Sequence, residues 1–417
     1  MTGVRSHFEP RKVFFSRLFL CDRKLLVCSA KPTRIDVGDS CKFRCRAKLF
    51  CLQEMRVMAS AVEYTTIQQQ IESLQGKGLL FDNKAHAELV LERYGYYNII
   101  NSYKEPYQNV VENHKKYIVG TTFEQIYSMF TLDHNLRNSI MAAMLELEEC
   151  LRAATAEVIA VSFGVDHHNY LKFRNYRDRY SSNPKFTLDS ILGKLRNNVG
   201  SDKDPIKYYR EKYQIVPPWI LFKGTYFSTL INLIKYLKKD EKQHLIRIVL
   251  RIPDDVEITE EITTLFQTIL FICLDYRNAA AHGGRIYNFQ SPHVRDVRIS
   301  EETIRCFPTL ENAEVSAGIQ LLLILLSIFK NRQSENIIHK SLEEQLNRHL
   351  GRYPNDLDIL SGCIGVVIHS AKYVWVNEKT RIYHSNDFCS GMTDGVKRKL
   401  EDIDTSIYCP CKRCIQE

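Results

Sequence analysis

The sequence predicts an all-α body followed by a small C-terminal domain built on a β-hairpin. Three observations lead to this fold class. Apolar residues recur at helical spacing through most of residues 66–350. No convincing alternation of apolar and polar residues, which would indicate strands, occurs before residue 365. Beyond Asp356 two short β-rich runs are followed by closely spaced cysteines. A composition of 44% hydrophobic and 25% charged residues is ordinary for a soluble globular protein.

Charge divides the chain into unequal parts. We expect an N-terminal extension (1–58), a helical domain (59–350) and a small Cys/His domain (356–417). The extension holds 13 of the 57 basic residues and five of the 49 acidic ones, which accounts for the whole net charge of +8. The rest of the chain is neutral, so any affinity for RNA or DNA must come from a local patch.

The extension contains Cys41 and Cys45, at most half of a metal site. The simpler hypothesis is that translation begins at Met55 or Met58 and that the extension is disordered or absent from the natural product.

Cysteine usage favours a reduced, cytoplasmic protein. The 13 cysteines are odd in number and crowd the two ends of the chain, which argues against a secreted disulfide framework. The apolar run Ala317–Phe329 is too short to span a bilayer, and no signal peptide fits residues 1–58. We therefore expect no membrane association.

Helix limits follow from capping residues and glycines. The longest expected helix starts at a capping box formed by Thr121 and Glu124 and ends at Gly164; about forty residues long, it is expected to bend or break once. Its apolar stripe is Leu136, Ile140, Met144, Leu147, Leu151 and Val158. Other helices are expected from Thr66 to Gly76, after Asn83, from Pro217 to Leu237, from Thr259 towards His282, from Val315 to Lys330, and from there to Leu350.

Two polar features of this body have a structural or a functional interpretation. Glu148 and Arg152, spaced i, i+4, are typical of a surface ion pair. Residues 165–216 are expected to be loop-rich with one short helix. Their basic residues alternate with aromatic ones, which is either a surface for RNA phosphates and bases or an ordinary solvated face. These residues are Lys172, Arg174, Arg177 and Arg179, with Tyr170, Phe173, Tyr176 and Tyr180.

The helix after Thr259 leads into an arginine and a histidine, Arg277 and His282, separated by small residues. Five residues turn an α-helix through about 140°, so the two do not share a stripe, but the long arginine can sweep towards the histidine across Ala279–Ala281. Gly283-Gly284 then ends the helix. Histidine can exchange the protons of RNA cleavage, and arginine can stabilise the charge on phosphorus, without a metal. One histidine cannot easily be both acid and base, which predicts a homodimer. The alternative is that both residues only cap the helix.

The C-terminal domain has the composition of a zinc site. Short strands are expected at Val366–Ile368 and Tyr373–Val376, followed by His384, Cys389 and the terminal cysteines. The predicted ligands are His384, Cys389, Cys411 and Cys414, with Cys409 as a spare or as a replacement for His384. Structural zinc would supply much of the folding free energy of such a small domain. The alternative is a set of reduced surface cysteines.

The motif around His282 also carries a family resemblance. Arg277-Asn278-x-x-x-His282-x-x-Arg285-Ile-Tyr287-Asn resembles the signature of the abortive-infection (Abi) family of bacterial phage-defence proteins, which is similar to the HEPN superfamily of R-x4-6-H ribonucleases. Further blocks agree in order over about residues 66–345: Ile71-Glu72-x-Leu74-x-x-Lys77-Gly78-Leu79, Leu91-Glu92-Arg93-x3-Tyr97, Gly120–Glu124, Leu132-Asp133-x-x-Leu136-Arg137, Leu147-Glu148-x-x-Leu151-Arg152 and Pro218-Trp219.

The resemblance implies a HEPN-like helical bundle with Arg277, Asn278 and His282 as the catalytic set and no cofactor for catalysis. It implies an RNA endonuclease toxin that leaves a 2′,3′-cyclic phosphate and arrests growth during phage infection. Two positions depart from the family pattern: Tyr287 replaces the usual tryptophan, and Gly283-Gly284 replace a histidine and a polar residue.

The competing hypothesis is a non-catalytic RNA-binding or partner-binding module of a defence system, with a small non-coding RNA or an antitoxin as partner. Replacing His282 with alanine separates the two hypotheses, because only the first requires the imidazole. A third hypothesis is that the cysteine-rich tail itself recognises a nucleic acid or a partner.

Overall fold

The computed structural model describes residues 64–111, 114–313, 316–364, 373–384, 389, 394–404 and 407–414. The N-terminal extension with Cys41 and Cys45, and the strand expected at Val366–Ile368, lie outside the described residues. The described chain is mostly helical, with a small β-sheet region near the C-terminus, and this agrees with the predicted fold class. None of the described helices is long and apolar enough to cross a membrane.

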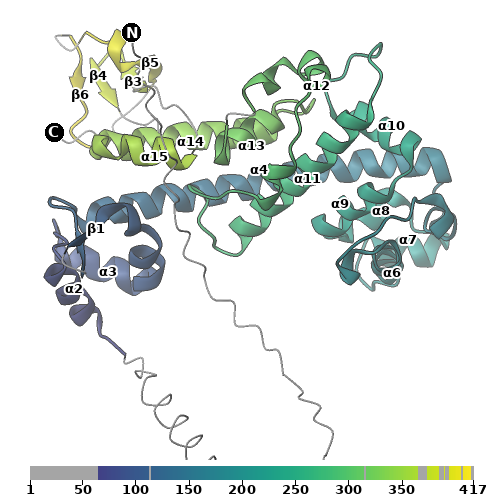
Figure 1. The fold of residues 1–417 in the computed structure, drawn as a ribbon, viewed down its shortest axis with the longest axis horizontal. Helices are drawn as coiled ribbons and strands as arrows, with labels where there is room; N and C mark the ends of the chain where they lie inside the picture. Colours follow the sequence, from purple (N-terminus) through teal and green to yellow (C-terminus); the bar gives the residue numbers. More distant parts are fainter. Residues whose placement is uncertain are drawn as a thin grey trace, which may run out of the picture. The chain divides into compact units, whose positions relative to one another are not determined.

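Helix α4 (Phe123–Phe163) is the longest element and runs lengthwise through the helical body (Figure 1). Helices α14, α11 and α10 pack on it, as does the short helix α8.

The other described helices are α2 (Ile67–Gly76), α3 (Lys84–Tyr94), α5 (His167–Tyr170), α6 (Leu188–Val199), α7 (Ile206–Tyr213), α8 (Pro218–Leu221), α9 (Phe227–Tyr236), α10 (Lys239–Val249), α11 (Glu260–Ala281), α12 (Glu301–Cys306), α13 (Gly318–Leu326), α14 (Gln333–Arg352) and α15 (Leu357–Ile364). Single 3-10 or π turns are η1 (Tyr97–Asn101), η2 (Glu105–Tyr107), η3 (Phe173–Asn175), η4 (Pro184–Phe186), η5 (Phe222–Gly224), η6 (Pro292–Asp296), η7 (Pro308–Asn312), η8 (Pro354–Asp356) and η9 (Leu400–Asp402).

Apolar spacing correctly predicted α4, but not its N-cap. All six residues of the predicted stripe are buried, and the helix is one uninterrupted element. The cap is Thr122, whose hydroxyl accepts from the Gln125 backbone N–H, so the predicted capping box at Thr121 is wrong. The Glu124 carboxylate instead accepts from the backbone N–H groups of Asp82 and Asn83, 3.1 Å each, and thereby ties the start of α3 to α4.

The body contains an antiparallel hairpin that the sequence did not predict. Strand β1 (Gln108–Val111) pairs with β2 (His114–Tyr117), with Gln108 opposite Tyr117. Each strand has only four residues, and three of the four residues of β2 are exposed. A strand this short and polar gives no period-2 apolar signal, so the expectation of a purely helical body was wrong here.

Three predicted helical segments differ from the observed ones. The segment from Pro217 to Leu237 is divided into α8, η5 and α9 around Gly224. Helix α13 stops at Leu326 because the following residues bridge to the end of α10: the Arg251 N–H donates to Ile328 O and the Lys330 N–H to Val249 O. Residues 165–216 hold three helices, not one, and α6 carries a helical repeat of buried residues that the sequence analysis missed: Leu188, Ile191, Leu192 and Leu195.

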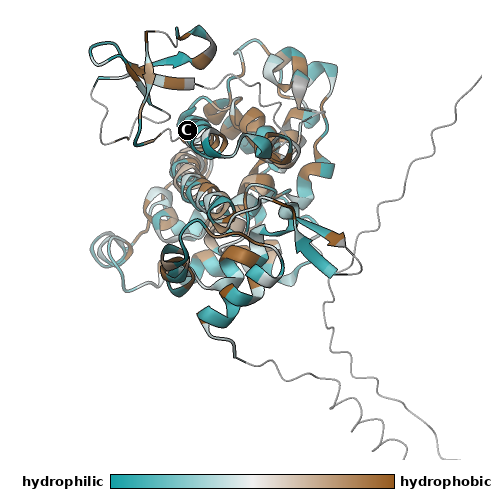
Figure 2. Cartoon of the chain, turned by 90° about the vertical axis from the view of Figure 1, so that its left-hand side faces the viewer, coloured by the Kyte–Doolittle hydropathy of each residue, from teal (hydrophilic) through white to brown (hydrophobic). Residues whose placement is uncertain are grey.

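The body has one continuous apolar core, drawn from elements between α2 and α15. In Figure 2 the brown, hydrophobic stretches of these helices lie largely towards the middle of the body. Glu148 is buried in this core region at 3% exposed and pairs with Arg152 at 2.6 Å, so the prediction of a surface ion pair was wrong. A buried pair is costly to break, because removal of one partner leaves an uncompensated charge.

The C-terminal sheet contains more strands than the predicted hairpin. Its order is β5-β3-β4-β6, from β3 (Tyr373–Asn377), β4 (Ile382–His384), β5 (Val396–Lys399) and β6 (Cys409–Pro410). Strand β3 is antiparallel to β4 and β5, whereas β6 is parallel to β4. The parallel pairing returns the chain end to the end of β4, where His384 lies.

Candidate functional site

Helix α11 carries the predicted Arg/His motif and is anchored at both ends. The Thr259 hydroxyl caps its start by accepting from the Ile262 N–H. At its end, Gly284 N–H donates to Ala279 O at 2.8 Å and Gly283 N–H to Ala280 O at 3.2 Å. These two bonds form a Schellman motif, which needs a left-handed residue at Gly283, whose φ is +72°. A Cβ on Gly284 would lie 3.0 Å from Ala279 O. The glycine pair therefore fixes the exit of the helix directly after His282.

The loop after His282 is held by two side chains of α4. The Asp133 carboxylate accepts from the backbone N–H groups of Ile286 at 2.7 Å and Tyr287 at 2.6 Å. The Arg137 guanidinium donates to Gly283 O at 3.0 Å. Asp133 and the loop with Ile286 and Tyr287 are about 150 residues apart in the chain, and these hydrogen bonds bring them together.

Asp133 is fully buried, and its carboxylate accepts a third hydrogen bond. The Tyr103 hydroxyl donates to its second oxygen at 2.6 Å. Burial raises the pKa of this carboxyl, while the hydrogen bonds from Tyr103, Tyr287 and Ile286 and the charge of Arg137 act in the opposite direction. In the sequence, Asp133 falls in one of the blocks quoted above, but no role for it could be predicted. Its signal was the spacing Asp133-x3-Arg137 alone, which also fits an ordinary helical ion pair.

Arg277 is partly buried and lies towards α4. Its charge lowers the pKa of Glu148, although burial, the largest influence, leaves that pKa raised overall; Arg152 also lowers it. The Arg277 Nη1 donates to Asn278 Oδ1 at 3.4 Å, a long contact, and its Nε has no hydrogen-bond partner among the residues that the structure describes. Arg152 in turn donates to Thr225 O at 3.0 Å, in the segment after Pro218-Trp219. Arg277 thus acts on the Glu148 carboxylate through its charge, whereas Arg152 contacts that carboxylate directly.

His282 is exposed and is the C-cap of α11. Within the described residues, no hydrogen bond or ion pair joins its ring to Arg277. The sweep of the arginine towards the histidine thus stays a prediction. One copy of the chain presents an accessible imidazole and, earlier on α11, a partly buried guanidinium whose charge acts to lower the pKa of Glu148.

A second histidine near the motif was not predicted. The Asp275 carboxylate, two residues before Arg277, contacts His293 Nδ1 at 2.8 Å and accepts from the Ser291 hydroxyl at 2.5 Å. The His293 ring stacks on Phe271. No spacing in the sequence indicates this group, since its members come together only when the loop after α11 folds back on the helix.

The predicted basic and aromatic cluster of residues 170–180 is divided by the fold. Tyr170 and Tyr176 are core residues, and their hydroxyls donate to Val216 O and Tyr170 O. Phe173 and Tyr180 are exposed, at 44% and 90%. Half of the aromatic residues are thus unavailable for stacking with bases.

The four predicted zinc ligands do come together in the C-terminal sheet. His384, Cys389, Cys411 and Cys414 place one ligand atom each within 4.8 Å of one another. Cys389 Sγ lies 3.7 Å from Cys411 Sγ, and Cys414 Sγ lies 3.6 Å from His384 Nδ1. Tetrahedral zinc with Zn–S of about 2.3 Å and Zn–N of about 2.05 Å requires separations of about 3.8 and about 3.6 Å. The residues present therefore fit zinc.

Strand pairing explains which residue is left out. Cys409 lies on β6 opposite Ile382 and is exposed, outside the cluster. The Cys411 N–H donates to Tyr383 O at 2.9 Å, which brings the terminal Cys-x2-Cys turn beside His384. Although burial acts to raise it, the pKa of the Cys411 thiol is lowered by backbone N–H groups of Arg413 and Cys414. Such N–H donors stabilise a thiolate, the form that binds metal.

Comparison with known proteins gives one match. The sequence model of a family described as Abi-like protein matches residues 89–288, from α3 to the loop after His282. This segment is Abi-like. The Abi-like segment is a little under half of the chain and includes α4, α11, Asp133 and the whole Arg/His motif. The cysteine cluster lies outside it. No curated protein and no solved structure matches the chain.

Proposed function

We propose that the chain is an abortive-infection effector that cleaves RNA without a metal, through Arg277, Asn278 and His282, as a homodimer. The Abi-like segment supports a role in phage defence. The proposed chemistry rests on one observation: the imidazole of His282 is exposed at the end of α11. Asp133 and Arg137, on α4, hold the loop that follows this helix end. A histidine that takes part in proton transfer needs both access and a fixed position.

In the proposed reaction the 2′-oxygen of a ribose attacks the adjacent phosphorus. A histidine accepts the proton of the 2′-hydroxyl, the P–O5′ bond breaks, and a second histidine donates a proton to the leaving 5′-oxygen. The products are a 2′,3′-cyclic phosphate and a 5′-hydroxyl. Each copy of the chain supplies one His282, so the dimer supplies both the base and the acid.

The arginine stabilises the negative charge that builds up on the phosphoryl oxygens. The charge of Arg277 acts on Glu148, which Arg152 contacts, so we expect the phosphate to compete with that carboxylate for the guanidinium. Asn278 accepts from the Arg277 guanidinium and thereby helps to orient it. We infer that RNA or the partner copy draws Arg277 towards His282.

The position of Arg277 also favours the second hypothesis, a module that binds RNA or a partner without cutting. If the Arg277 guanidinium only balances the charge of the buried Glu148, its role is structural. Growth assays separate the two. Expression of the wild type should arrest growth and reduce phage yield, whereas His282→Ala should do neither.

The matched control is His339→Ala, which removes an exposed histidine from α14. It should arrest growth like the wild type. Undiminished arrest by a well-folded His282→Ala protein would contradict the nuclease and favour the binding module.

A further inference from the structure

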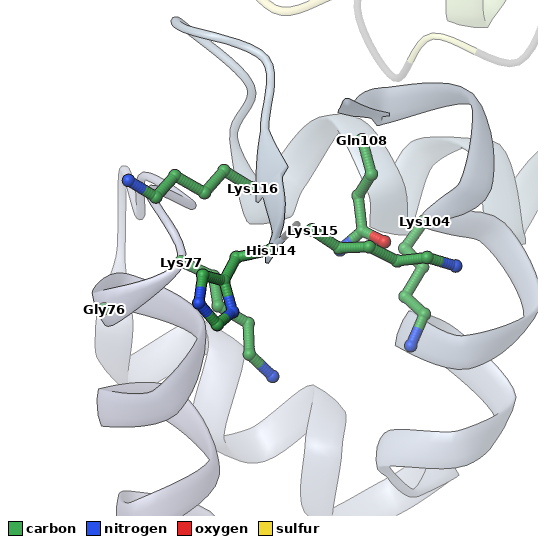
Figure 3. Close-up of a pocket in the computed structure, with 7 residues that line it drawn as sticks. All are labelled: Gly76, Lys77, Lys104, Gln108, His114, Lys115 and Lys116. Atoms are coloured by element: carbon green, nitrogen blue, oxygen red, sulfur yellow. The ribbon is translucent and has the colours of Figure 1, made fainter. Parts of the chain in front are cut away.

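The hairpin β1–β2, the end of α2 and the turn before η2 enclose a cavity of about 380 Å³ whose lining is strongly basic. Its lining residues, called the lysine pocket below, are Gly76, Lys77, Lys104, Gln108, His114, Lys115 and Lys116. Lys77 is the C-cap of α2, and Lys104 immediately precedes η2. Figure 3 shows Lys104 and Lys115 extending to the same side, Lys77 beside His114, and Lys116 pointing away.

Three ammonium groups of the lysine pocket are close enough to influence one another. The pKa of Lys104 is lowered, first by burial and then by the charges of Lys77 and Lys115. Lys104 donates to the side-chain oxygen of Asn101, a neutral partner. None of the pocket's lysines forms an ion pair with a carboxylate of the described residues; Glu112, in the hairpin turn, lies outside them. Folding thus brings like charges together at an energetic cost that a bound anion would offset.

The lysine pocket and the loop after His282 share their supports. Arg285, three residues after His282, donates to Ser102 O at 3.0 Å. The next residue, Tyr103, donates to the same Asp133 carboxylate that holds Ile286 and Tyr287. The chain segment that carries Lys104 is therefore fixed directly to the motif loop. An extended polyanion seated in the pocket would be positioned relative to His282 by these bonds.

We infer that the lysine pocket binds consecutive phosphates of the RNA strand whose cleavage is proposed above. Ammonium groups bind phosphate as point charges and carry no base information, so this binding is independent of sequence and sensitive to salt. The neutral charge of the chain outside residues 1–58 gives no general attraction for RNA, so a local pocket has to supply it. The inference rests on the proposed function but concerns binding, which is measured separately from cleavage.

The test is RNA binding by full-length protein carrying His282→Ala, which keeps the probe intact. A single-stranded RNA of about 20 nucleotides covers one or two such binding sites. In this background, Lys77, Lys104 and Lys115 are all replaced with glutamine. Loss of three phosphate contacts should raise the Kd about 100-fold near 0.1 M salt and reduce the slope of log K against log salt by about 2. Replacing the same three residues with arginine should preserve binding, and Lys116→Gln alone should have the smallest effect.

The matched control removes the same charge elsewhere: Lys203, Lys207 and Lys223, all exposed, replaced with glutamine. It should leave the Kd and the salt slope unchanged. Equal weakening by control and pocket variants would overturn the inference, as would displacement of the RNA by an equal phosphate concentration of inorganic phosphate.

Cleavage by the same variants with His282 restored separates this inference from the proposed function. If the wild type cleaves RNA and the pocket variant binds it normally, the pocket inference fails and the nuclease stands. If binding requires the three lysines and no variant cleaves, the nuclease fails and the pocket stands.

Discussion

The helical body and the C-terminal sheet achieve stability in different ways. The body buries one continuous core that includes residues from α2 to α15. Among its described residues, the sheet has an apolar cluster of three buried residues, Val374, Val376 and Ile403. A core this small supplies little hydrophobic stabilisation, and metal ligation is one of the usual supplements. We therefore expect the body to fold without a metal and the sheet to depend on its Cys/His cluster.

The same contrast applies to the two candidate sites. The predicted zinc ligands come from separate segments, yet the pairing of β4 with β6 brings them together. Arg277 and His282 are five residues apart on one helix, where five residues turn through about 140°, and no hydrogen bond among the described residues joins their side chains. Under the proposed function, a second copy of the chain has to complete that site.

Removal of zinc should have the largest effect and should act on the sheet alone. Apparent zinc-binding free energies of structural sites are about 10–16 kcal/mol, and this is folding free energy. The two tryptophans report separately, since Trp375 on β3 is 8% exposed and Trp219 on α8 is 46% exposed. In a Trp219→Phe protein, a chelator or Cys411→Ser should shift the Trp375 emission to the red, while the helical circular dichroism should remain.

Cys409→Ser is the control for the zinc prediction, because Cys409 is exposed and lies outside the cluster. It should retain one zinc per chain and the emission of the parent protein. A sheet that stays folded and protease-resistant after complete loss of metal would break the contrast between the two regions.

Loss of the Asp133 carboxylate should be the most damaging change in the body. Asp133→Ala leaves two backbone N–H groups and the Tyr103 hydroxyl without their acceptor. The expected loss is about 3–5 kcal/mol, measured by urea unfolding followed by circular dichroism. Asp254→Ala, at an exposed loop position, should cost less than about 0.5 kcal/mol. Equal costs for the two variants would show that Asp133 does not anchor the loop after His282.

A smaller effect is expected at Asp356, which joins the end of α14 to α4. Its carboxylate accepts from Tyr107, Gln125 and His349, at 2.7–2.8 Å. Although burial opposes the shift, these hydrogen bonds lower the Asp356 pKa below its usual 3.8. Because the folded-state pKa is lowered, the stabilisation exists above pH 3.8 and is lost as the pH falls through the folded-state value.

Asp356→Asn should therefore cost about 2 kcal/mol at neutral pH, as expected for hydrogen bonds to a charged group. Thermal unfolding between neutral pH and pH 3 should show the difference between wild type and variant shrinking on the acid side. A difference that grows below pH 3.8 would contradict the lowered pKa.

The smallest effect tests the corrected start of α4. Thr122→Ala should destabilise the body by about 1 kcal/mol, whereas Thr122→Ser should be nearly neutral because the capping hydroxyl remains. Thermal denaturation of the two variants is sufficient. If alanine and serine behave alike, Thr122 does not cap the helix.

Local signals in the sequence explain what was predicted and what was not. The stripe along α4 and the Thr259 cap of α11 were predicted because each depends on residues within one or two turns. The hairpin β1–β2 was missed because its polar strands give no periodic signal. The burial of Glu148 was missed because the sequence cannot show that α11 and the Thr225 segment pack over that face of α4.

The same distinction between local and long-range information applies to the candidate sites. The types and spacing of the residues indicated five candidate zinc ligands. The pairing of β6 with β4 places one of them, Cys409, outside the cluster. The Arg/His motif was found from local sequence. The role of Asp133 as the anchor of its loop could be recognised only from hydrogen bonds between residues about 150 positions apart. The lysine pocket combines α2, the Lys104 turn and the hairpin, so no single stretch of sequence reveals it.

The most direct test of the central claim is RNA cleavage in Mg²⁺-free buffer by purified wild-type protein beside His282→Ala. Mixed cellular RNA is the substrate, and the ends of the fragments are read. The wild type should give fragments ending in 2′,3′-cyclic phosphate, and loss of the proton-transferring imidazole should slow cleavage by about 10²–10⁴-fold. Equal cleavage by His282→Ala, or no cleavage by a dimeric wild type that binds RNA, would contradict the nuclease.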